Sequence, residues 1–110
     1  MQLQNLLADI PAQLDSELSE RLVSKGAVTI ERILSRGQSS PDSGWYDQNE
    51  DEWVAVIEGE AILTFADGRD YHLHAGDHLL IPAHSQHRVS WTPSDRTTIW
   101  LAVHFCTPPG

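Results

Sequence analysis

The residues of this sequence best suited to chemistry are a carboxylate and an imidazole that stand far apart in the chain. Glu52 immediately precedes the short apolar run 53–57, and His87 begins the run 87–91. Residues 46–50, just before the glutamate, are rich in ionisable and polar groups. Carboxylate, imidazole and amide groups together can bind a divalent ion or move a proton, so these residues predict a polar site.

The segments that carry this pair have the pattern of β-strands. From residue 53 onward short apolar runs alternate with turn residues at a spacing of roughly eight to twelve residues, which is typical of an antiparallel sandwich or barrel. Because side chains alternate along a strand, two sets each share one face. The sets are Glu52, Val54 and Val56, and His87, Val89 and Trp91. Each joins one polar residue to two apolar ones, as a barrel with a ligand site at one end requires.

The N-terminal residues predict a different element. Leucines recur at every fourth position from 14 to 22, and a lysine and a glycine follow, so we expect a short amphipathic helix over residues 16–25. The apolar residues upstream fit either another helical turn or a strap. Alternating β-branched residues then predict a first strand, followed by a loop over 37–44. We therefore expect a helical segment, residues 1–26, packed on a barrel domain, residues 27–110.

The composition excludes several classes of partner and site. A chain of 110 residues is the size of one domain, and its net charge of −9 argues against nucleic acid and anionic membranes as partners. The single cysteine, Cys106, excludes an intrachain disulfide and a thiol-bound zinc. The N-terminus has neither a basic start nor a long apolar run. We therefore expect a cytoplasmic protein.

Two motifs resemble those of the cupin family. One is Glu52 followed by Gly59 within EWVAVIEGEAILTF, and the other joins Gly76 to His87 within GDHLLIPAHSQHRV. The resemblance covers about residues 28–105 and is strongest to small single-domain bacterial cupins. It implies an all-β, double-stranded β-helix (jelly-roll) barrel of two sheets, usually a homodimer, with a divalent metal at the open end. Glu52 and His87 would be two of its ligands.

The first motif departs from the family pattern. The two histidines of a His-x-His pair that should precede the glutamate are absent, and Tyr46 and Gln48, or Asp47 by a longer spacing, stand there. We therefore predict a metal held by Gln48, Glu52 and His87, for which manganese, iron, nickel and zinc are all admissible. The alternative is a buried hydrogen bond between Glu52 and His87 without a metal.

Two functions follow from such a pocket. The first is a metalloenzyme that acts on a polar small molecule such as a sugar acid or a keto acid, by isomerase, lyase or dioxygenase chemistry. Tyr46 or Asp47 would then move the proton. The second is a small-molecule-binding or sensor module without turnover, which the missing histidine pair favours.

Four other histidines belong either to the site or to the surface. His84, in a proline corner, is either a second imidazole of the site or a surface turn residue. His104, on the last strand, either lines the pocket or is a partly buried structural residue. His72 and His74 share one face of a strand, which we interpret as solvated.

Overall fold

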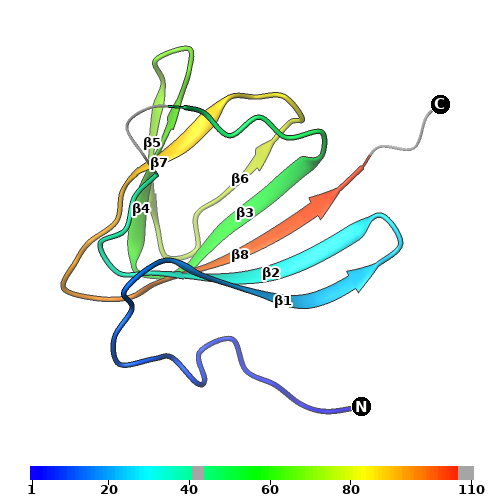
Figure 1. Ribbon diagram of the computed structural model, residues 1–110, viewed down its shortest axis with the longest axis vertical. Coiled ribbons are helices and arrows are strands. Elements are labelled where there is room, and N and C mark those ends of the chain that lie inside the picture. Colours follow the sequence, from blue (N-terminus) through cyan, green and yellow to red (C-terminus); the bar gives the residue numbers. More distant parts are fainter. Residues whose placement is uncertain (41–43, 107–110) are drawn as a thin grey trace.

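The computed structural model describes residues 1–40 and 44–106, and it folds them into two antiparallel sheets (Figure 1). Residues 41–43 of the predicted loop lie outside the described residues. Within the described part the chain forms strands and no helix. The strands are β1 (Leu18–Lys25), β2 (Val28–Ser35), β3 (Asp51–Glu58), β4 (Glu60–Phe65), β5 (Asp70–His74), β6 (His78–Ile81), β7 (His87–Trp91) and β8 (Thr98–Phe105).

The two sheets enclose one apolar core. The larger sheet has the strand order β1-β2-β8-β3-β6, and the smaller has the order β5-β4-β7 (Figure 1). The inward side chains of both sheets form one buried cluster, which consists of Val54, Val56, Ala61, Leu63, Leu73, Ile81 and Trp100. The all-β, two-sheet barrel predicted from the sequence is confirmed. Nowhere in the described residues is there a helix long and apolar enough to cross a membrane.

The helix predicted over residues 16–25 is wrong, because residues 18–25 form strand β1. Gly26 has a φ of +58° and lies in a tight turn that pairs Lys25 with Val28. β1 is the edge strand of the larger sheet, and most of its side chains are exposed. An exposed edge strand does not need apolar and polar side chains to alternate strictly. The sequence of β1 therefore shows the four-residue leucine spacing of a helix and no two-residue pattern of a strand.

The residues before β1 form a strap, which is one of the two alternatives the sequence left open. The guanidinium group of Arg32, on β2, donates hydrogen bonds to the carbonyl oxygens of Leu6 and Ala8 at 3.0 and 2.6 Å. The same group pairs with the carboxylate of Glu20 on β1 at 2.6 Å. Arg32 is therefore directed toward the strap and is not among the residues that line the cavity described below.

Strand β7 presents its first residues inward, as predicted, but not its last. His87 and Val89 line the space between the sheets, whereas Trp91 is 38% exposed. Val89 pairs with Leu63 while Trp91 pairs with Ile62, so β7 contains one extra residue in a β-bulge. The bulge reverses the alternation, which places Trp91 on the outer face of the smaller sheet.

Candidate functional site

A cavity of about 240 Å³ lies between the two sheets. Its apolar floor comes from core residues, and its polar lining comes from β1 and the residue before it, β2, β3, β7 and β8, together with the segment before β3. The polar residues are Glu17, Ser19, Glu31, Tyr46, Gln48, Glu52, His87 and His104. No lysine or arginine is among the described residues that line this cavity.

The carboxylate of Glu52 lies between two imidazoles in this cavity. Its Oε1 atom is 3.6 Å from Nε2 of His87, and its Oε2 atom is 3.8 Å from Nε2 of His104. Alternation along β3 turns Glu52 inward, and the register of β3 with β8 sets His104 directly beside it. Glu52 is 8% and His87 4% exposed. Both distances exceed a normal hydrogen bond, so the carboxylate faces the rings without bonding them closely.

The orientation of His87 leaves one ring nitrogen directed into the cavity. Its Nδ1 atom lies 2.8 Å from the carbonyl oxygen of Ser85, so Nδ1 carries the proton and donates it. Nε2 then faces Glu52. Burial lowers the pKa of His87, whereas the Glu52 carboxylate and the Ser85 carbonyl raise it. The second effect is larger, so the pKa lies above its ordinary value.

Tyr46 and Gln48 reach the cavity from the segment before β3. The backbone N–H of Tyr46 donates to the carbonyl oxygen of His87 at 2.8 Å, and a reciprocal bond of 3.2 Å completes the bridge. The two rings lie 5.8 Å apart. The backbone carbonyl oxygen of Gln48 accepts a hydrogen bond from the backbone N–H of His84 at 2.8 Å, which leaves its side-chain amide out of this bond. These backbone bonds fix the segment against the start of β7.

Asp47 and His84 lie outside the cavity. The Nδ1 atom of His84 is 2.8 Å from Oδ1 of Asp47, and the amide of Gln86 contacts the other oxygen at 3.3 Å. These hydrogen bonds lower the pKa of Asp47 although the group is exposed. Of the two residues predicted to move a proton, the structure brings only Tyr46 to the cavity, and His84 is a surface residue of the corner.

The cavity is more acidic than the sequence motifs indicated. Oε2 of Glu31, on β2, lies 3.9 Å from Nε2 of His104, and Glu17 joins the lining at the rim. Burial and the nearby charge of Glu52 both raise the pKa of Glu17. Sequence reasoning missed Glu17 and Glu31 because their inward direction depends on the β1–β2 hairpin, which had been predicted as a helix and a strand.

Most of the chain matches the model of one protein family. The model described as "Cupin domain" matches residues 31–104. The chain belongs to the cupin domain family. In the solved structure of a "putative mannose-6-phosphate isomerase" from Ralstonia eutropha JMP134, 41% of residues are identical, the coverage is 97% of this cupin and 100% of that chain, and the TM-score is 0.92.

More distant structures share the fold of this cupin. A "sugar phosphate isomerase" of the cupin superfamily from Silicibacter pomeroyi is 25% identical, with a TM-score of 0.69, over 86% of this cupin and 62% of that chain. A cupin with a double-stranded β-helix fold from Methanocaldococcus jannaschii is 22% identical, with a TM-score of 0.71, over 91% and 89%. Among curated proteins there is no match.

Proposed function

We propose that this cupin binds a divalent metal ion in the cavity through Glu52, His87 and Gln48, and acts there on a polar, sugar-derived acid or keto acid. The observation that carries the proposal is the position of Glu52 opposite the Nε2 atom of His87. Their separation of 3.6 Å is too long for a strong hydrogen bond. It is close to the spacing of about 3.3 Å between two ligands at tetrahedral positions around one ion with bonds of about 2.0 Å.

The surroundings of the pair also fit a metal. The Ser85 carbonyl binds the Nδ1–H group of His87, which is how metal-binding histidines are usually oriented. Because His87 and His104 approach different oxygens of Glu52, an ion shared by Glu52 and His87 would bind Oε1 and leave His104 between Glu52 and Glu31. Gln48 lines the same cavity and would be the third ligand.

The charge of the cavity supports the same proposal. Several carboxylates line it, and the described lining residues include no lysine or arginine, so an anionic substrate would be repelled by the protein alone. A bound divalent ion would offset two of these negative charges and polarise a substrate carbonyl. We assign the proton transfer to the phenol hydroxyl of Tyr46, and support comes from the ring of this residue, whose centroid lies 5.8 Å from that of His87. Asp47, engaged by His84 outside the cavity, has no part in this proposal.

Sugar isomerisation is the reaction we favour within this proposal. Support comes from the name of the Ralstonia eutropha protein, which is 41% identical over nearly the whole chain. Moving a proton between neighbouring carbons of an open-chain sugar requires a polarised carbonyl and one proton carrier, and the cavity would offer both.

The second candidate is a non-catalytic module that binds a small molecule without a metal. The absence of the His-x-His pair favours it, because Tyr46 and Gln48 are weaker ligands than histidine. In that case the cavity would select neutral or cationic ligands, since its carboxylates would remain uncompensated.

Metal analysis separates the two candidates. Tag-free protein carrying His72→Ala and His74→Ala, which removes a histidine pair on the outer surface, is dialysed with manganese, iron, nickel or zinc and assayed for bound metal. We expect about one equivalent, and its loss in the same protein with Glu52→Gln or His87→Ala added. His84→Ala is the matched control and should retain the metal. No bound metal in the starting protein would overturn the proposal and leave the metal-free module.

The homodimer and the cytoplasmic location expected from the sequence stay predictions. Light scattering on the purified protein measures the first directly. The cytoplasmic prediction is supported by Cys106, which is exposed and free. Exposed free thiols are common in proteins of reducing compartments.

A further inference from the structure

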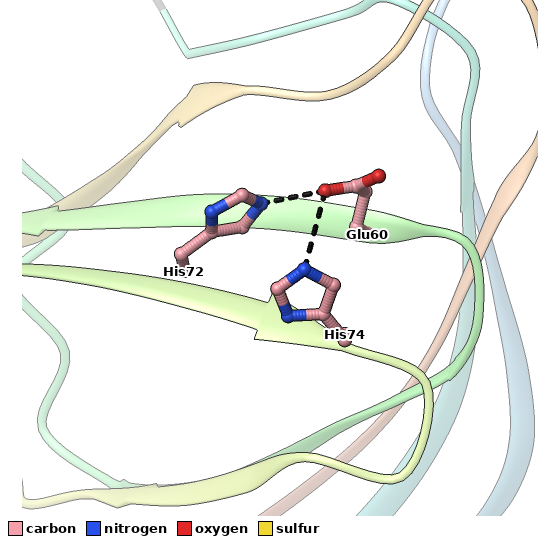
Figure 2. A group of neighbouring side chains, drawn as sticks. All are labelled: Glu60, His72 and His74. Carbon is pink, nitrogen blue, oxygen red and sulfur yellow. Dashed lines mark hydrogen bonds and ion pairs between the residues drawn. The ribbon is translucent and has the colours of Figure 1, made fainter.

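A second group of ligand-type side chains lies on the outer face of the smaller sheet. His72 and His74 are two apart on β5, so alternation turns both rings to the same side while Leu73 enters the core. Glu60, on β4, pairs directly with His74 across the two strands. Figure 2 shows both rings directed at one oxygen of the Glu60 carboxylate.

The ligand atoms of this group are already close to one another. Oε2 of Glu60 is 2.6 Å from Nε2 of His72 and 3.6 Å from Nε2 of His74. One ligand atom from each of the three residues can be chosen so that all lie within 4.8 Å. Ligands at tetrahedral positions around a zinc ion are about 3.3 Å apart, so small side-chain rotations would suffice to coordinate an ion.

Two neighbouring residues pack against this group. Oδ2 of Asp77 accepts a 2.7 Å hydrogen bond from the backbone N–H of His74 and lies 3.8 Å from Nδ1 of the same residue. That separation is too long for a hydrogen bond to the ring, but it puts a carboxylate near the nitrogen that faces away from Glu60, where carboxylates orient histidines in zinc sites. Arg96 binds the other oxygen of Glu60, Oε1, so that Oε2 faces the two rings.

The group is separate from the cavity. Glu60 and the two histidines project from the outer face of β4 and β5, whereas Leu63 of β4 lines the cavity on the inner face. The side chains of His72 and His74 are 48% and 62% exposed, and that of Glu60 is 19% exposed. A bound ion would therefore be held by three protein ligands on one side and have at least one coordination position open to water.

We propose that Glu60, His72 and His74 form a second divalent-metal site, specific for zinc-like ions. Two imidazole nitrogens with one carboxylate oxygen suit Zn²⁺, Ni²⁺, Co²⁺ and Cu²⁺, and they are poor ligands for Mg²⁺ and Ca²⁺, which require more oxygen atoms. The two-histidine, one-carboxylate set with an open fourth position is that of a catalytic rather than a closed structural zinc site.

Calorimetric titration of tag-free protein with Zn²⁺ tests the site. The starting protein carries Glu52→Gln and so lacks the proposed cavity ligand, which keeps a failure here distinct from a failure of the cavity proposal. We expect about one equivalent of Zn²⁺ to bind, and His72→Ala or His74→Ala to weaken binding at least about tenfold. Mg²⁺ should give no heat of binding. His78→Ala, an exposed histidine on β6, is the matched control and should bind Zn²⁺ unchanged.

Trp91 provides a second readout that locates the ion. Its ring lies edge-on to His72 with centroids 5.9 Å apart, so Ni²⁺ bound here should quench its fluorescence. Trp91→Phe should keep Zn²⁺ binding and lose most of the Ni²⁺ quenching. Equal Zn²⁺ binding by the double variant His72→Ala/His74→Ala, or full quenching without Trp91, would overturn the proposal. Circular dichroism of each variant checks that these exposed substitutions leave the fold intact.

Discussion

Glu52 and His87 join the two sheets across the cavity, with 3.6 Å between Oε1 of the first on β3 and Nε2 of the second on β7. Both side chains are buried. Removing a carboxylate and a protonated imidazole from water costs a free energy on the order of several kcal/mol per ion. An ion pair at this distance offsets that cost only in part. We therefore propose that the pair serves ligand binding rather than the stability of the barrel.

The first prediction concerns the pH dependence of stability in metal-free protein. Burial lowers the pKa of His87, but Glu52 and the Ser85 carbonyl leave it above its ordinary value. The folded protein thus holds this proton more tightly than the unfolded chain, in which the pKa is about 6.5. The stabilisation is complete below that pH and is lost as the pH rises through the folded pKa. Urea denaturation with EDTA should show a free energy of unfolding that falls above about pH 6.5.

The matched comparison for this prediction is His87→Gln against His78→Gln. The first should flatten the pH dependence, whereas the second, at an exposed histidine on β6, should leave it as in the unsubstituted protein. An equal pH dependence in all three proteins would show that His87 does not gain its proton on folding.

The second prediction concerns the turn between β3 and β4. Gly59 has a φ of +88°, and a Cβ atom there would lie 2.8 Å from the Cα of Thr98 and 2.9 Å from the carbonyl oxygen of Thr97. Gly59→Ala should therefore lower the free energy of unfolding by about 2 kcal/mol or more. Gly76 has a similar φ, +93°, with nothing within 4 Å, so Gly76→Ala should cost about 1 kcal/mol. Equal losses in thermal or urea denaturation would contradict the close approach of Thr98.

The third prediction concerns the strap. Arg32 holds it through the carbonyl oxygens of Leu6 and Ala8, so Arg32→Met should release residues 1–14 and cost about 1–2 kcal/mol of unfolding free energy. Limited chymotrypsin digestion followed by mass spectrometry should show faster cleavage within those residues. Arg36→Met, at an exposed arginine with one 3.3 Å bond to the Asp95 carbonyl, is the control. Unchanged cleavage in Arg32→Met would show that the strap is held by other contacts.

How far the sequence predicted this structure depends on whether a residue's position follows from local pattern. Glu52 and His87 are turned inward by period-two alternation, and the turn at Gly59 is marked by its residue type, so the fold and this pair were predictable. Trp91 was not, because a single-residue bulge in β7 reverses its direction without any signal in the sequence.

The acidic lining and the outer histidine group were missed for a related reason. Glu31 reaches His104, and Glu60 reaches His74, only through the pairing of particular strands in a particular register. Register is a tertiary property, so one sequence shows a His-x-His pattern but not the carboxylate beside it. The strand β1 was missed because exposure on both faces removes the alternation that would reveal it.

The fourth prediction concerns His104, which lies between the carboxylates of Glu52 and Glu31 at 3.8 and 3.9 Å. His104→Leu would remove the ring and leave the two acids facing each other, with no lysine or arginine among the described residues lining the cavity around them. We expect a loss of about 1–3 kcal/mol of unfolding free energy in EDTA at neutral pH. Because a divalent ion can replace the imidazole between two carboxylates, added Mn²⁺ should stabilise His104→Leu by more than it stabilises the unsubstituted protein. The outward-facing His78→Leu should lose little stability and should gain from Mn²⁺ only what the unsubstituted protein gains. A His104→Leu protein as stable as the unsubstituted one would mean that the acids are already separated by solvent.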